Sequence, residues 1–166
     1  LVAALDASVQ NKARAGISMV APDGFDVQAP GQPDVPEMDG KPRDEEPRFD
    51  LIRESWDGTR IGFRVYEDWM DIINAYPTTS GLPIYIISTN TYDREADIPP
   101  AQNYPQGWLT TALSVVNEEP QIYAVCWFLD IFPHSDQWDW FSLGKQPGRL
   151  VDAAEEFDAL LRVSSP

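Results

Sequence analysis

The alternation of helical segments with short, almost continuous apolar runs most constrains what this chain can fold into. Apolar residues recur with a helical period in four segments, which are residues 1–15, 63–76, 107–117 and 149–162. Three apolar runs follow the first three helical segments, and they are residues 17–21, 82–87 and 122–129. Runs without polar alternation are typical of strands buried on both faces. Helices that alternate with such strands predict an α/β fold with a parallel sheet and right-handed crossovers.

A long polar loop follows each predicted strand, whereas the connections from helix to strand are short. These loops are residues 22–57, 88–105 and 130–148. Because ligands bind beyond the carboxyl ends of parallel strands, we expect function on this face of the fold. The loop of residues 22–57 is acidic and rich in proline, with 11 acidic and 4 basic residues between Asp23 and Asp57. We interpret it as an insertion within one α/β domain, or barrel fragment, of residues 1–166.

The composition excludes several classes of partner. The 27 acidic and 12 basic residues give a formal net charge of −15, which argues against nucleic acids and anionic membrane surfaces. The sequence lacks the run of about 20 apolar residues that a membrane span requires. Cys126 and His134 are the single cysteine and the single histidine, so no cysteine or histidine metal site and no cofactor are expected. We expect Cys126 to be a buried, inert side chain. The acidity and the tryptophan content suit an extracellular or cell-surface protein and are also compatible with the cytoplasm.

Aromatic and short polar side chains gather where the second and third predicted strands end. Exposed rings can stack on the C–H faces of sugars, while carboxylates and amides bond the sugar hydroxyls. The alternative is that the aromatic residues belong to the core, which is the simpler interpretation for Trp127 and Phe128 on their buried strand. The predicted saccharide-binding residues are Asn90, Tyr92, Trp127, Asp130, His134, Trp138 and Trp140.

Three motifs resemble the carboxyl-terminal part of clan-A glycoside hydrolases, which are cellulase-like (β/α)8 barrels. The motifs are LPIYIISTNT at residues 82–91, YPQGW at 104–108 and AVCWF at 124–128. The resemblance covers residues 63–143, and residues 1–25 more loosely. It implies that the chain corresponds to the last three βα units of a TIM barrel, which form an incomplete barrel. It also implies that Trp127 is the tryptophan that floors the sugar subsite at the end of the eighth strand.

The sequence departs from the family pattern at the catalytic nucleophile. Ser88 stands where the resemblance places a glutamate, and Thr89 and Asn90 match the two residues after it. A retaining glycosidase needs two carboxyl groups about 5 Å apart, and a serine cannot form the glycosyl ester in that role. The family's acid/base belongs to the fourth strand, ahead of the region of resemblance. We therefore assign no catalytic residue. We expect a carbohydrate-binding fragment or pseudoenzyme that does not hydrolyse saccharides on its own.

Two other functions remain open at this point. The first is a structural or interaction subunit, because three strands cannot close a barrel and leave both sheet edges open. Its partner would be another protein chain or the missing amino-terminal half of a barrel. The second is a serine-type hydrolase that uses Ser88, Asp130 and His134, although the segment around Ser88 lacks the Gly-x-Ser-x-Gly turn of the α/β-hydrolases.

The acidic side chains of the first loop also raise the question of a calcium site, because carboxylate oxygens are the ligands that Ca²⁺ prefers. The EF-hand spacing is absent, and a solvated loop is the simpler interpretation. The residues concerned are Asp34, Glu37, Asp39, Asp44, Glu45 and Glu46.

Overall fold

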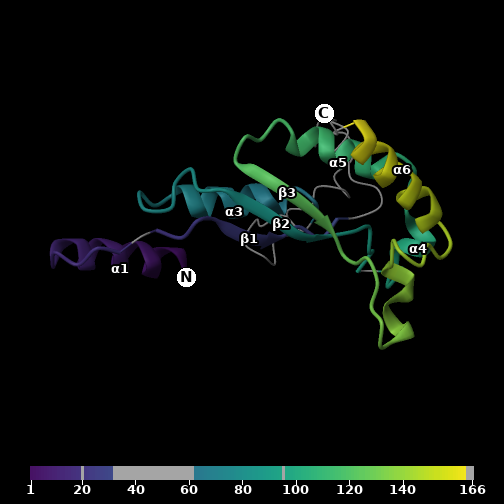
Figure 1. The fold of residues 1–166 in the computed structure, drawn as a ribbon, viewed down its shortest axis with the longest axis horizontal. Coiled ribbons are helices and arrows are strands. Elements are labelled where there is room, and N and C mark those ends of the chain that lie inside the picture. Colours follow the sequence, from purple (N-terminus) through teal and green to yellow (C-terminus); the bar gives the residue numbers. More distant parts are fainter. Residues whose placement is uncertain (20, 32–61, 95, 164–166) are drawn as a thin grey trace.

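The computed structural model describes residues 1–19, 21–31, 62–94 and 96–163 (Figure 1). Its strands are β1 (Phe25–Gln28), β2 (Ile84–Thr89) and β3 (Ile122–Trp127). Its helices are α1 (Val2–Arg14), α3 (Val65–Asn74), α4 (Pro100–Asn103), α5 (Trp108–Val116), the 3-10 helix η4 (Asp136–Phe141) and α6 (Leu150–Val163).

The three described strands form one parallel sheet in the order β1-β2-β3. The α/β class with parallel strands and intervening helices is therefore confirmed. The sheet is open within the described part of the chain, with β1 and β3 at its edges. Figure 1 shows α1 at one end of the molecule, beyond the end of the sheet. The correspondence to the end of a TIM barrel stays a prediction.

The first strand lies later in the chain than the sequence predicts. Residues 17–19 have no regular structure, and Ile17 is exposed. The strand is instead β1, which lies inside the predicted acidic loop and pairs Phe25 with Ile84 of β2. The prediction of a strand at residues 17–21 is therefore wrong. Residues 32–57 of that loop, with the acidic residues considered for calcium, lie outside the described residues.

The sheet is packed on one face and exposed on the other. Ile84 and Ile86 of β2 are fully buried, whereas Ile87 is 45% exposed and Tyr123 of β3 is 66% exposed. Right-handed crossovers between strands in sequential order place the connecting helices on a single face. The prediction that the second and third strands are buried on both faces is wrong, and so is the prediction for Cys126, which is exposed.

The core fills the space between the packed face of the sheet and the helices. Phe63 contacts the rings of Tyr66 and Trp108 edge to face, with centroids 5.6 Å and 5.4 Å away. Leu150 brings α6 into the same cluster. Burial of each large side chain of this kind contributes about 1.5–3 kcal/mol. This core supports the loops that leave the carboxyl ends of β2 and β3.

Glu156 of α6 holds the amino terminus of α5. The residue that caps α5 is Gly107, which has no side chain to accept a hydrogen bond from the first turn. The Glu156 carboxylate accepts hydrogen bonds instead from the Gly107 N–H at 2.9 Å and the Thr110 N–H at 2.6 Å. It also accepts one from the Tyr104 hydroxyl at 2.6 Å. These contacts lock α5 and α6 together.

Gly148 makes the turn into α6, and replacement by alanine is expected to destabilise the fold by about 2 kcal/mol. Its φ is 55°, and a Cβ there would overlap the Ala101 carbonyl oxygen, which accepts a hydrogen bond from the Arg149 N–H. Gly81 is the matched control, because its φ is 76° and a Cβ would meet nothing within 4 Å. Gly81→Ala should therefore cost about 1 kcal/mol. Urea denaturation measures both, and equal losses would contradict the steric argument.

Candidate functional site

A cleft of about 510 Å³ lies beyond the carboxyl ends of β2 and β3, and we call it the aromatic cleft. Its rings come from two different loops, Tyr92 after β2 and the other four after β3. Its aromatic lining residues are Tyr92, Phe128, Trp138, Trp140 and Phe141. The remaining lining residues are Asn90, Asp97, Pro99 and Gln137. The position agrees with the face on which we expected function.

Asn90 joins the two loops that form the cleft. Its Oδ1 accepts a hydrogen bond from the Tyr92 N–H at 2.8 Å, and its Nδ2 donates to the Phe128 carbonyl at 3.1 Å. The side chain is almost fully buried. Half of its hydrogen-bonding capacity is thus used to fix the walls, so Asn90 acts mainly as a positioning residue.

Tyr92 and Asp97 form a hydrogen-bonded pair on the β2 side of the cleft. The Tyr92 hydroxyl donates to Asp97 Oδ1 at 2.7 Å. This hydrogen bond, followed by desolvation and the negative charge of Asp97, raises the pKa of Tyr92 above its ordinary value. The hydroxyl therefore stays protonated at neutral pH, and its oxygen can still accept a hydrogen bond from a ligand.

Phe141 connects the aromatic rings of the cleft. Its ring lies 5.5 Å from Tyr92 and 5.5 Å from Trp138, measured between centroids. Trp138 also contacts Phe128 edge to face at 5.7 Å. These contacts fix the Trp138 ring, whereas Trp140 stays 49% exposed. Trp138 is therefore a wall of the cleft, and Trp140 is free to stack on a ligand.

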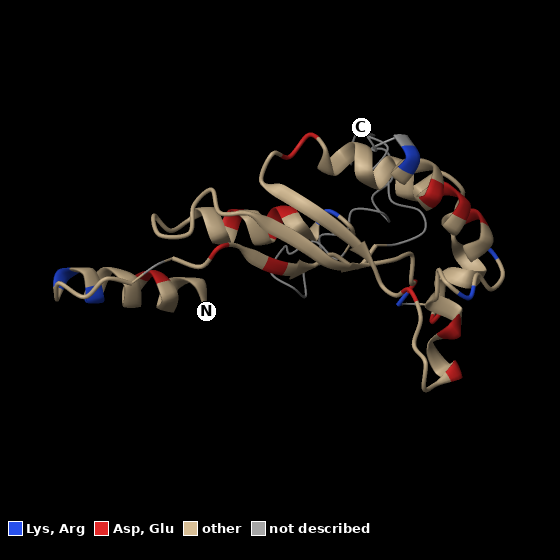
Figure 2. Ribbon diagram, viewed as in Figure 1, with Lys and Arg blue, Asp and Glu red and all other residues tan. Residues whose placement is uncertain are grey.

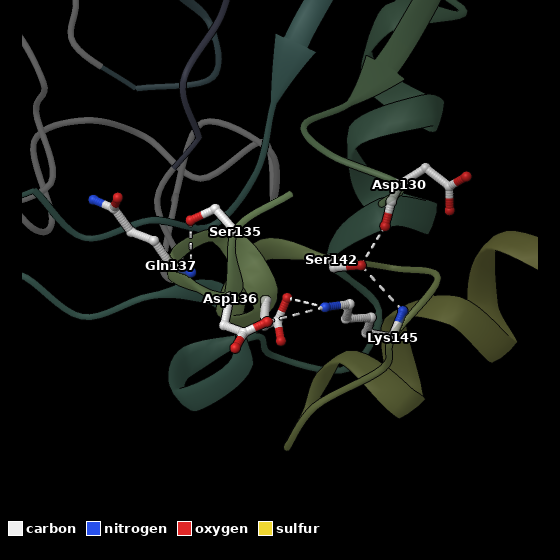
Figure 3. Close-up of polar contacts among 7 residues, drawn as sticks. Asp130, Ser135, Asp136, Gln137, Ser142 and Lys145 are labelled. Carbon is white, nitrogen blue, oxygen red and sulfur yellow. Dashed lines mark hydrogen bonds and ion pairs between the residues drawn. The ribbon is translucent and has the colours of Figure 1, made fainter. Parts of the chain in front are cut away.

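The helix η4, which presents both tryptophans, is fastened at each end by polar contacts (Figure 3). At its start, the Ser135 hydroxyl oxygen accepts a hydrogen bond from the Gln137 N–H at 3.2 Å. After it, the Ser142 hydroxyl donates to the Asp130 carbonyl and accepts from the Lys145 N–H. The Lys145 ammonium pairs with Asp139 and lies 3.9 Å from Asp136. A short 3-10 helix needs such contacts, because its own hydrogen bonds are weak.

Four of the seven predicted saccharide-binding residues lie together in the cleft, and three do not line it. Trp127 is partly buried and packs instead against the core, with its ring edge to face with Tyr104 and Trp108. Its Nε1 donates to the Phe141 carbonyl at 3.0 Å. Asp130 contributes its backbone carbonyl to the support of η4, and His134 is exposed. The residues within the cleft are Asn90, Tyr92, Trp138 and Trp140. Their role in binding stays a prediction.

Sequence reasoning missed other lining residues, chiefly Asp97, Gln137 and Phe141. Gln137 and Phe141 flank the two predicted tryptophans in sequence, so the Gln-Trp-Asp-Trp-Phe run carried a signal. Asp97 had none, because its place follows from a hydrogen bond to Tyr92 five residues away.

The serine hydrolase alternative gains no support from the geometry. Ser88 lies on β2, whereas Asp130 and His134 lie in the loop after β3, and among described residues these three side chains share no hydrogen bond. Within the same residues, no group of three or more histidine, cysteine or acidic side chains could hold a metal ion. No helix that the structure describes has the length and apolar content to cross a bilayer.

Comparisons of the chain with protein-family models, with curated proteins and with solved structures gave no match. The fold and the cleft define the class of this chain as α/β, with an open parallel sheet and an aromatic cleft at the strand ends.

Proposed function

We propose that the aromatic cleft binds a saccharide, and that this chain is a glycoside-hydrolase-like carbohydrate-binding fragment or pseudoenzyme. The observation that carries the proposal is the meeting of five aromatic rings with amide and carboxylate groups in one cleft at the strand ends. The cleft volume falls within the range of about 300–1,000 Å³ that is typical of small-molecule sites. The glycoside-hydrolase resemblance at residues 82–91 and 124–128 supports the same function.

Sugars suit this lining because they have apolar and polar surfaces at right angles. The C–H face of a pyranose ring can lie on Trp140, which is half exposed and projects from η4. The hydroxyls at the ring edge can then bond the Gln137 amide, the Asp97 carboxylate and the Tyr92 oxygen. Aromatic contact gives affinity, and the polar groups give orientation.

Hydrolysis is not part of the proposal, because glycoside hydrolysis needs a pair of carboxyl groups, about 5 Å apart in retaining enzymes and about 6.5–9.5 Å apart in inverting ones. Asp97 is the single carboxylate that lines the cleft among the described residues, and its Oδ1 accepts a hydrogen bond from the Tyr92 hydroxyl. Ser88 stands at the nucleophile position implied by the resemblance and cannot form a glycosyl ester there. A saccharide would thus be bound and released unchanged.

The test is a titration of the protein with oligosaccharides of differing linkage and substitution, followed by tryptophan fluorescence and by isothermal calorimetry. We expect at least one saccharide to perturb the tryptophan emission saturably, with no release of reducing ends on prolonged incubation. A panel without any saturable response would contradict saccharide binding. Release of reducing ends would contradict the pseudoenzyme assignment. We include an extracellular or cell-surface location in the same proposal, because a saccharide-binding protein encounters polysaccharides there.

A second candidate function, that of an interaction subunit, is favoured by the exposed face of the sheet. Ile87 and Tyr123 present large apolar surfaces there, and the edge strands β1 and β3 carry unpaired backbone groups within the described chain. The partner would be another protein chain or the amino-terminal half of a barrel.

Sedimentation velocity tests whether the partner is a second copy of this chain. Association that rises with concentration and is lost in Tyr123→Glu would support it, and a monomer at all concentrations would contradict it.

A further inference from the structure

We infer that the saccharide that fits the aromatic cleft carries free ammonium groups, as an oligosaccharide of deacetylated amino sugars does. This inference rests on the proposed saccharide binding and names the class of saccharide. Three features of the cleft lead to it: the charge of its lining, the aromatic rings around that charge, and the charges at its rim.

The charge of the lining is negative. Among the residues that line the cleft, Asp97 is the charged one. Its Oδ1 is engaged by the Tyr92 hydroxyl, while no described residue engages Oδ2. A carboxylate accepts hydrogen bonds and cannot donate them, so its strongest partner is a cation that also donates. An ammonium group has both properties, and a neutral hydroxyl has one of them.

The aromatic rings add to the attraction for a cation. Ring faces carry negative potential, and an ammonium group within about 6 Å of a ring centroid is attracted to it. Tyr92, Trp138 and Trp140 line the same cleft as Asp97, and Tyr92 is hydrogen-bonded to it. A ring that stacks on a sugar also lies beside the substituents of that sugar. The same rings can therefore hold both the C–H face and the ammonium group of an amino sugar.

The charges at the rim have the same sign. Asp93 and Asp97 both act on the Tyr92 hydroxyl as negative charges, and Arg94 opposes them. Across the cleft, η4 carries Asp136 and Asp139. Figure 2 colours the acidic positions of the described chain red. Lys145 is shared between the carboxylates of Asp136 and Asp139. The cleft and its rim thus hold four carboxylates and two cationic side chains, so their net charge is negative, like the net charge of −15 of the whole chain. A negative rim repels acidic sugars and attracts amino sugars.

The experiment compares three β-1,4-linked hexasaccharides with the same backbone, made of glucose, N-acetylglucosamine and glucosamine, by calorimetry in slightly acidic, low-salt buffer. We expect the glucosamine hexamer to bind about 10-fold more tightly than either of the others. Asp97→Asn should lower the affinity for the glucosamine hexamer about 10-fold, and that for the glucose hexamer less than about 2-fold, because the asparagine amide can still bond sugar hydroxyls. Asparagine keeps an Oδ1 acceptor for Tyr92 and tolerates the φ of 54° at this position, so the loop should fold as before.

Non-specific attraction to an acidic protein is measured with hexalysine, whose binding should not change in Trp140→Ala. The inference is overturned if the three hexamers bind equally, if a neutral one binds most tightly, or if Asp97→Asn keeps the preference. It is also overturned if hexalysine binds as tightly as the glucosamine hexamer with the same dependence on Trp140. In each of these cases, saturable binding of any hexamer leaves the proposed function standing. Failure of every hexamer and of the wider oligosaccharide panel removes both.

Discussion

Replacement of Glu156 by alanine is expected to lower the free energy of unfolding by about 3 kcal/mol. The carboxylate accepts hydrogen bonds from Tyr104, from the Gly107 N–H and from both the N–H and the hydroxyl of Thr110. Alanine would leave the first turn of α5 uncapped, because Gly107 offers no side chain, and would leave the largely buried Tyr104 hydroxyl without its acceptor. Urea denaturation measures the loss.

The matched control is Glu155→Ala, at an exposed position on the same helix. It makes the same change of charge and should alter stability by less than about 0.5 kcal/mol. Similar losses in the two variants would contradict the capping role of Glu156.

The effect of Glu156 should depend on pH. Burial acts to raise the pKa of its carboxyl group, but the hydrogen bonds from Thr110, Tyr104 and Gly107 outweigh burial and hold the pKa below its ordinary value. A lowered pKa in the folded state means that the stabilisation is complete above the unfolded-state pKa of about 4.3. It is lost as the pH falls through the lower folded-state value. The difference between wild type and Glu156→Ala should therefore be full near neutral pH and shrink in acid, whereas a constant difference would contradict this account.

Replacement of Trp140 by alanine should weaken saccharide binding about 50-fold, in the range of a binding hot spot. The side chain is 49% exposed, and it is absent from the ring contacts that join Tyr92, Phe128, Trp138 and Phe141. Trp140→Ala should therefore change the free energy of unfolding little, although it removes the most accessible stacking surface of the cleft. Calorimetry with the best saccharide of the panel measures the affinity.

Trp69 provides the control for Trp140. It is 43% exposed on α3 and is not part of the cleft lining. Trp69→Ala should leave saccharide affinity unchanged. Equal affinities of the two variants, whether both fall or both stay at the wild-type value, would show that the sugar does not stack on Trp140.

Periodicity predicts the four longer helices α1, α3, α5 and α6 and the parallel sheet, because the burial pattern repeats along each element. The short helices α4 and η4 lie in segments that were predicted as loops. Periodicity fails at the first strand. The run of residues 17–21 has the apolar content of a buried strand, whereas β1 alternates inward Val27 with outward Asp26 and Gln28 over four residues. So short a pattern inside an acidic segment has little signal of its own. The sequence pattern of β3 could not predict that Tyr123 and Cys126 are exposed. Their exposure depends on which face of the sheet is covered by other parts of the chain.

The place of the candidate site was predictable, and the direction of each side chain was not. Tyr92 and Trp140 were expected at one edge of the sheet because long loops after parallel strands gather there, and both line the aromatic cleft. Trp127 was assigned to the site by resemblance, yet its ring is partly buried and packs against Trp108 of the core. Asp97 was missed because its position depends on a hydrogen bond from the Tyr92 hydroxyl within the same loop, and such a contact has no sequence signature.

The most direct test of saccharide binding at the aromatic cleft is the response of individual tryptophan indole N–H signals in nuclear magnetic resonance spectra. The chain has 6 tryptophans, so each indole signal can be assigned by substitution with phenylalanine. Titration with a bound saccharide is predicted to shift the signals of Trp138 and Trp140 and to leave that of Trp69 unchanged. Binding that shifts Trp69 while Trp138 and Trp140 stay in place would contradict the central claim.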